Sequence, residues 1–177
     1  MNTNDYFHMN AVRILKDGNY LASARHTQTI MKIDKTSGKI LWHMGKGKLN
    51  NFKFVDDPYD GFSHQHAPEE LDNGNILIWD NGIDSIKDGS RVAEYEIDET
   101  NHTATLVWSK EFQNLQANVA GNCHKISENS YIAAFGSQGY IEEFNKDGTK
   151  VLSIDPGGLI YQVCLLYTSP SPRDGLL

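Results

Sequence analysis

The sequence is short of cysteine, of clustered positive charge and of long apolar runs, and each shortage excludes a class of protein. Only two of its 177 residues are cysteine. No apolar run approaches the ~20 residues of a membrane-spanning helix, so no span is predicted. The formal net charge of −7 and a pI near 5.4 argue against a nucleic-acid surface, which needs clustered Lys and Arg. Met1–Asn10 has no charged start followed by an apolar stretch, so it does not read as a secretory signal.

The C-terminal residues differ from the rest of the chain. Cys164–Asp174 reads CLLYTSPSPRD and resembles the in-frame translation of a transposase-type sequencing adaptor. We therefore expect one domain over residues 1–163 and a non-native tail over residues 164–177 that packs against nothing. Cys123 is then the one remaining cysteine, so no disulfide within the chain is predicted. We also expect the chain to be a fragment that lacks elements on both sides.

One structural unit recurs about every 56 residues, which becomes clear when Leu15, Leu71 and Ile126 are aligned. The words that follow them, KDGN, DNGN and SENS, are rich in residues that favour hairpin turns. Each turn leads to an apolar second strand, an alternating third strand and, after another turn, a fourth strand. No window shows the periodicity of a helix.

Four short antiparallel strands in a repeated unit are typical of a β-propeller blade. We predict an all-β fold, a partial propeller of about three four-stranded blades, with inner strands near Ala11–Leu15, His66–Leu71 and His124–Ile126. Insertions are expected at Lys46–Gly61 and Asn81–Ser90, because the period exceeds the ~40–45 residues of a WD40 blade. A sandwich of hairpins is the alternative, but sandwiches do not demand internal repetition.

Polar residues precede the inner strands, which start near the channel of a propeller. His8 and Asn10 hold this position in the first unit, His64 and His66 in the second, and Gly121 and Asn122 in the third. Arg25 ends the second strand of the first unit, which runs back beside the inner strand. We expect these side chains to converge on one polar pocket at the axial mouth, with the His66 imidazole accessible to substrates.

Three segments resemble the bacterial aryl-sulfate sulfotransferases: Tyr6–Asn10, Ser23–His26 followed by TIMKID, and Gln65–His66 followed by the LDNGNIL turn. The resemblance implies a six-bladed propeller that moves a sulfuryl group from an aryl sulfate donor to a phenol acceptor. It implies no nucleotide donor and no other cofactor. The partners are small molecules, and the location is periplasmic or secreted.

The resemblance also assigns roles, and the chemistry suits them. His66 matches the nucleophile that becomes transiently sulfated, and neutral imidazole is a good nucleophile at neutral pH. Arg25 matches an arginine whose planar fork can hold two sulfuryl oxygens. Asn10 and His8 match a pair that can stabilise charge on the leaving oxygen, with His8 as proton donor and acceptor. His64 and Asn122 are candidate substrate-binding residues.

Other interpretations of these residues stay open. His64 and His66 lie two residues apart, so they point the same way on a strand and could bind a metal ion, although we predict none. Arg25 could be a rim ion-pair partner of Asp80 or Asp84. A propeller that only binds a partner or acts as a scaffold is the competing function, because a quinoprotein-like phrase, KIDKTSGKILW, also occurs.

Overall fold

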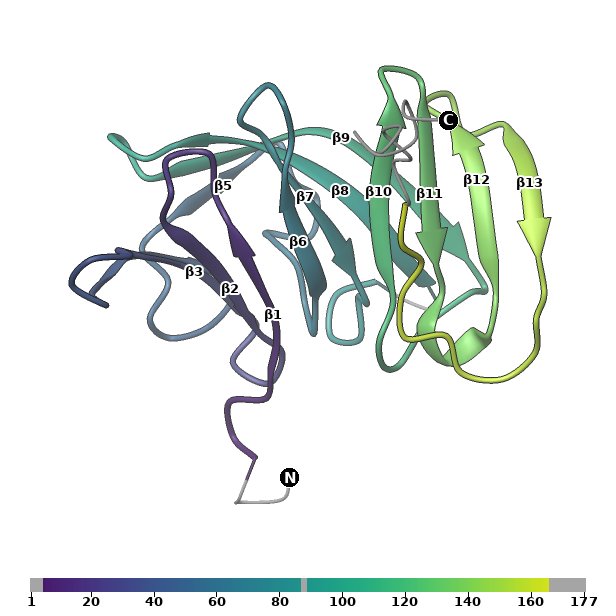
Figure 1. Ribbon diagram of the computed structural model, residues 1–177, viewed down its shortest axis with the longest axis horizontal. Helices are drawn as coiled ribbons and strands as arrows, with labels where there is room; N and C mark the ends of the chain where they lie inside the picture. The colour runs from purple at the N-terminus through teal and green to yellow at the C-terminus, as the bar shows by residue number, and fades with distance from the viewer. Residues whose placement is uncertain (1–4, 87–88, 166–177) are drawn as a thin grey trace, which may run out of the picture.

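The computed structural model describes residues 5–86 and 89–165. Three sheets follow one another in chain order and fan out side by side, from the purple sheet through the teal one to the green one (Figure 1). One 3-10 turn, Gly136–Gln138, interrupts the strands of the third sheet. The three predicted blades are therefore confirmed. No helix in the described residues is long and apolar enough to span a membrane.

The first and third blades have the predicted four strands in simple consecutive order. In the first blade these are β1 (Met9–Ile14), β2 (Tyr20–Ala24), β3 (Thr29–Ile33) and β4 (Ile40–Gly45). In the third they are β10 (Asn122–Ser127), β11 (Ser130–Ala134), β12 (Ile141–Asn145) and β13 (Lys150–Ile154). All neighbouring strands in both sheets pair antiparallel.

The second blade corrects the prediction of four antiparallel strands. Its order is β5-β9-β8-β7-β6, and the fifth strand pairs parallel with its neighbour. The strands are β5 (Lys53–Val55), β6 (His66–Glu70), β7 (Ile76–Asp80), β8 (Gly89–Asp98) and β9 (Thr103–Gln113). The short β5 comes from the insertion expected at Lys46–Gly61, which the blade uses to extend its outer edge.

The aligned turns of the first two blades have the same hydrogen bonds. The Leu15 N–H donates to the carbonyl oxygen of Asn19, and the Leu71 N–H donates to that of Asn75, each at 2.8 Å. The glycine of each turn, Gly18 or Gly74, donates back to the leucine carbonyl at 2.9 Å and has positive φ. Glycine adopts this conformation without steric cost, so the similar segments KDGN and DNGN form the same type of turn.

Two hydrophobic cores lie between successive blades, and β7 contributes to both. Ile76 and Ile78 face the core shared with the first blade, whereas Leu77 and Trp79 face the core shared with the third. This is the alternation of a strand whose two faces are both covered. Trp42 and Trp79 are buried in these cores, and Trp108 stacks on Tyr131 with 4.3 Å between ring centroids.

After β13 the chain turns back and runs beside β10, as the yellow segment in Figure 1 shows. The Asn122 Nδ2 donates to the Val163 carbonyl oxygen at 2.7 Å, and the Val163 N–H donates to Asn122 Oδ1 at 2.8 Å. Cys164 is exposed and lies in no strand. The rest of the tail, residues 166–177, lies outside the described residues, so its proposed adaptor origin stays a hypothesis.

Candidate functional site

The three blades enter their inner strands through the same strained backbone conformation. His8, His64 and Ala120 have φ angles of 51°, 55° and 59°, which non-glycine residues adopt at a cost of about 1–2 kcal/mol. Two residues after each come Asn10, His66 and Asn122, which therefore hold equivalent positions at the mouths of neighbouring strands. We call these three positions the strand mouths. The repeat thus places these three positions at the start of the first strand in each blade's chain order.

His66 is more deeply buried than expected. His66 is the first residue of β6 and pairs across the sheet with Trp79. The residue is only 4% exposed. The expectation of an accessible imidazole is therefore wrong for most of the ring. Nδ1 lies 2.8 Å from Asn81 Oδ1 and 3.2 Å from the His64 carbonyl oxygen, and these groups cover that edge. Among the described residues, both hydrogen bonds of the ring are made at Nδ1, and none joins Nε2.

Burial keeps the His66 imidazole neutral. Removal from water lowers the pKa of His66 from 6.5 to about 4, although the Asn81 hydrogen bond acts in the opposite direction. The positive charges of Arg25 and His8 lower the pKa further, so both groups are near enough to act on the ring. At neutral pH this histidine has a free nitrogen lone pair, which a nucleophile requires.

Arg25 follows β2, where that strand meets the entry to β1. Its N–H donates to the His8 carbonyl oxygen at 2.9 Å, and its guanidinium Nη2 donates to the Asn118 carbonyl oxygen at 2.7 Å. Burial lowers the pKa of Arg25, while Asp84 and Asp5 act to raise it. The suggested ion pair with Asp80 does not form, since Asp80 binds Arg91 instead. Arg25 is therefore a half-buried cation whose guanidinium is held by the Asn118 carbonyl oxygen.

Asn10 and Gln65 connect the mouth of the first blade to that of the second. Asn10 Nδ2 donates to the Gln65 carbonyl oxygen at 2.7 Å. The Gln65 side chain is fully buried and its Nε2 lies within 3.0–3.2 Å of Ser23 Oγ and the carbonyl oxygens of Ala24 and Thr29. Gln65 thus fixes the end of β2, and with it Arg25, relative to the adjacent His66.

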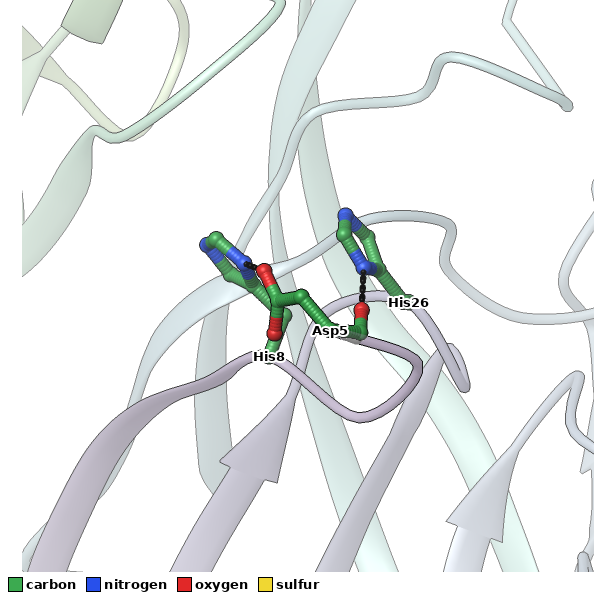
Figure 2. A group of neighbouring side chains, drawn as sticks. All are labelled: Asp5, His8 and His26. Carbon is green, nitrogen blue, oxygen red and sulfur yellow. Dashed lines mark hydrogen bonds and ion pairs between the residues drawn. The ribbon is translucent and has the colours of Figure 1, made fainter. Parts of the chain in front are cut away.

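His8 lies beside Asp5 and His26, close to the start of β1 and the end of β2 (Figure 2). His8 Nδ1 bonds to Asp5 Oδ2, and His26 Nδ1 lies 2.6 Å from the Asp5 main-chain oxygen. The His8 bond lowers the pKa of Asp5, which therefore stays ionised. Within the described residues this is the one group of three potential metal ligands, and the pair His64 and His66 gains no third ligand.

His64 and Asn122 occupy different situations. The His64 ring has Nδ1 3.4 Å from Asp84 Oδ2 but makes no hydrogen bond there, and burial followed by the Arg25 charge lowers its pKa. Asn122 uses both ends of its amide on Val163, with Nδ2 also 3.0 Å from His124 Nε2. His64 therefore lies within the electrostatic reach of Arg25, whereas the Asn122 amide is already occupied by the chain itself.

Unpartnered buried polar atoms gather at this place. In the described residues, seven enclosed side-chain N or O atoms lack a hydrogen-bond partner, and four of them lie here: Asn10 Oδ1, Arg25 Nε, His64 Nδ1 and Gln65 Oε1. An unsatisfied buried polar group costs about 1–3 kcal/mol, so native proteins seldom cluster them without a purpose. The site is one that a polar ligand would complete.

Sequence reasoning missed a buried ionic cluster under the entry to β6. Arg91 is fully buried and forms two 3.0 Å bonds to Asp57 and a 2.9 Å bond to Asp80. Asp80 Oδ1 in turn accepts from the Ser63 N–H at 2.9 Å, which fixes the loop ahead of His64. Burial acts to lower the pKa of Arg91, but its bonds to Asp57 outweigh this and raise it. The partners lie up to 34 residues apart, so no local motif signals them.

The profile described as Arylsulfotransferase (ASST) matches residues 1–172 of the chain. The chain belongs to the arylsulfotransferase family. The match includes every strand mouth and Arg25, so the resemblance drawn from three segments is confirmed over nearly the whole chain. No curated protein matches the sequence.

Solved structures with a similar fold are distant in sequence. A protein of unknown function from Bacteroides caccae has a TM-score of 0.58 and 16% identity over 91% of this chain and 50% of its own. The periplasmic gluconolactonase PpgL of Pseudomonas aeruginosa has a TM-score of 0.53 and 10% identity, over 85% and 40%.

The β-propeller domain of Cps50 (Swd1) from Myceliophteria thermophila has a TM-score of 0.50 and 12% identity, over 85% of this chain and 44% of its own. These likenesses confirm the β-propeller fold and say nothing of activity. The chain spans half or less of the length of each of these structures.

Proposed function

We propose that this chain carries the catalytic site of an aryl sulfotransferase that transfers a sulfuryl group through a sulfated His66. Family membership over residues 1–172 supports the reaction class. The observation that carries the site assignment is the group of unpartnered buried atoms on Asn10, Arg25, His64 and Gln65, next to a neutral, desolvated histidine. A sulfate ester would supply an acceptor oxygen for the unpartnered Nε of Arg25 and a negative charge beside its guanidinium.

In the first step, a lone pair on the His66 imidazole forms a bond to sulfur while the bond from sulfur to the phenolic oxygen breaks. The electron pair of that bond leaves on the phenolate, which takes a proton from a protonated His8. Arg25 holds the non-bridging sulfuryl oxygens, and Asn10 stabilises the charge that moves to the leaving oxygen. The products are a phenol and an N-sulfated imidazole.

In the second step, an acceptor phenol attacks the same sulfur. Its proton passes to His8, its oxygen forms the new bond to sulfur, and the bond from sulfur to nitrogen breaks. The electron pair returns to the His66 ring, which is again neutral. The hydrogen bond from His8 Nδ1 to Asp5 orients the His8 ring in both steps. One site therefore serves donor and acceptor in turn, and no cofactor takes part.

The test uses the full-length protein that contains this chain and an aryl sulfate given without acceptor. We expect one phenol to be released per site and one sulfuryl group to remain on the peptide that contains His66. His66→Ala should abolish both, and Arg25→Met should slow transfer ~10²–10³-fold, as loss of an oxyanion donor does. His43→Ala, on the outer strand β4, is the matched histidine control and should keep full activity.

Two outcomes would contradict the proposal. Robust transfer by the His66→Ala protein would eliminate the covalent intermediate and leave direct transfer between two bound phenols. No transfer by the unaltered protein with any aryl sulfate, together with binding of a partner through its loops, would favour the competing hypothesis of a binding or scaffold propeller.

A further inference from the structure

The hydrogen bonds around His66 determine which of its two nitrogens carries the proton. Two oxygen atoms lie within hydrogen-bond distance of Nδ1: Asn81 Oδ1 at 2.8 Å and the His64 carbonyl oxygen at 3.2 Å. A carbonyl oxygen can only accept, so the Nδ1 edge of a neutral ring needs the N–H there. This assignment also requires that Asn81 presents its Oδ1, and not its NH₂ group, to the ring.

The orientation of the Asn81 amide follows from its other neighbours. Nδ2 lies 2.7 Å from the Ala117 carbonyl oxygen and 3.0 Å from the Ala120 carbonyl oxygen. Two carbonyl oxygens can be met only by the two N–H groups of the amide, since a flipped amide would put oxygen against oxygen. Oδ1 must therefore face His66. Asn81 itself is fully buried, so no water competes for these bonds.

From this geometry we infer that Asn81 is a positioning residue that keeps His66 protonated on Nδ1 and leaves Nε2 as the sulfur-attacking atom. The inference rests on the proposed function for its catalytic meaning, but the tautomer stands on the hydrogen bonds alone. It adds to the reaction a residue that the sequence presents only as the Asn of an Asn-Gly turn. Both ring hydrogen bonds among the described residues are at Nδ1, so Nε2 is the nitrogen that this arrangement leaves for the substrate.

A neutral acceptor suits a transient intermediate. When Nε2 bonds to sulfur while Nδ1 keeps its proton, the ring gains a formal positive charge, and the Asn81 carbonyl dipole stabilises it through the existing hydrogen bond. A carboxylate at this place would stabilise the charged ring more strongly. It would then protonate His66 before attack and slow the loss of sulfate afterwards. It would also cancel part of the positive charge of Arg25, which an anionic substrate needs.

Asn81 also couples the nucleophile to the third blade. It follows the last residue of β7, and the carbonyl groups that hold its amide belong to the 117–120 loop that leads into β10. Ser90 Oγ secures the same loop, since it donates to the Asn81 main-chain oxygen and accepts from the Ala117 N–H, each at 3.0 Å. Ser90 does not touch His66. It therefore offers a matched control that loosens the loop without altering the ring.

The test measures the ¹⁵N chemical shifts of the His66 ring in the unaltered protein and in Asn81→Asp, Asn81→Leu and Ser90→Ala variants. We expect the unaltered protein and Ser90→Ala to show Nδ1 protonated and Nε2 bare. Asn81→Leu should show a mixture of tautomers and lose ~10–100-fold in phenol release, as is usual when an orienting partner is removed. Asn81→Asp should keep the tautomer and move the acid limb of the pH–rate profile upward, because a carboxylate raises the ring pKa.

The outcomes separate the two proposals. A bare Nδ1 in the unaltered protein would overturn the assignment of Asn81, whatever the activity. Nδ1 protonated without sulfation of His66 would leave the assignment of the tautomer intact and contradict the proposed function. If the Asn81 variants do not fold, the ¹⁵N chemical shifts of the unaltered protein still decide the assignment of the tautomer. An Asn81→Asp profile that superimposes on that of the unaltered protein would likewise contradict the inference.

Discussion

At the scale of single residues, the site depends on keeping one histidine neutral in a place from which water is excluded. Burial lowers the pKa of His66 to about 4, whereas the same residue in an unfolded chain has its ordinary value of 6.5. The unfolded chain therefore takes up a proton at a higher pH than the folded one. Because the pKa is lower in the folded chain, the contribution of neutral His66 to the free energy of unfolding is present above pH 6.5 and is lost as the pH falls toward 4.

We predict from this that His66 makes folding more sensitive to mild acid. Between pH 7 and pH 4.5 the free energy of unfolding should fall by about 2 kcal/mol more in the unaltered protein than in His66→Gln, which cannot titrate there. Urea unfolding of both proteins at the two pH values measures the difference. Comparing the pair cancels the other histidines. A difference that does not change with pH would mean that His66 is not desolvated in solution.

At the scale of elements, the site is assembled by side chains that join one strand mouth to the next. Asn10 reaches from the first blade to the Gln65 carbonyl oxygen of the second, and Asn122 reaches from the third blade to the Val163 carbonyl oxygen in the same manner. Gln65 makes the return connection from the second blade to β2. The relative placement of Arg25 and His66 therefore depends on Gln65 more than on either strand alone.

Gln65→Leu should accordingly lower both stability and turnover. The substitution keeps the side-chain volume but leaves the carbonyl oxygens of Ala24 and Thr29 buried without this donor. Each unsatisfied oxygen lowers the free energy of unfolding by about 1–3 kcal/mol if the surrounding structure does not rearrange. Thermal unfolding and the rate of phenol release measure the two effects. Gln138→Leu is the control: Gln138 also donates to a carbonyl, at 2.7 Å from Gln116, but on the surface. Equal losses in both variants would contradict a role for the buried connection.

The sequence predicts best what is local. The turn segments after Leu15 and Leu71 determine the hairpins. The alternating pattern of side chains in the strands that follow determines which side chains enter which core. It predicts poorly what joins distant segments. β5 has only three residues and pairs with β9, some fifty residues later, so its pattern carries no signal. Asn81 reads as a turn residue because the loop that orients its amide lies 36–39 residues away.

At the scale of the whole molecule, burial is distributed unevenly across the fan of blades. The five residues of β7 are all buried, because this strand lies between the cores of two interfaces. The five residues of β13, at the outer edge of the third blade, are all exposed. Opening β7 to solvent therefore requires both interfaces to separate, whereas β13 can detach from β12 alone.

Amide hydrogen exchange should reveal this gradient as the last prediction. We expect the β7 amides to exchange only through global unfolding, and the outward amides of β13 to exchange ~10²-fold faster or more, through local fraying. Mass spectrometry of peptides that cover the two strands gives the rates, and β12, paired on both sides, is the internal reference. If β13 were as slow as β7, its free edge would have to be covered in solution. Dilution would then identify the cover, since a second copy of the chain dissociates on dilution and an edge paired within the same molecule does not.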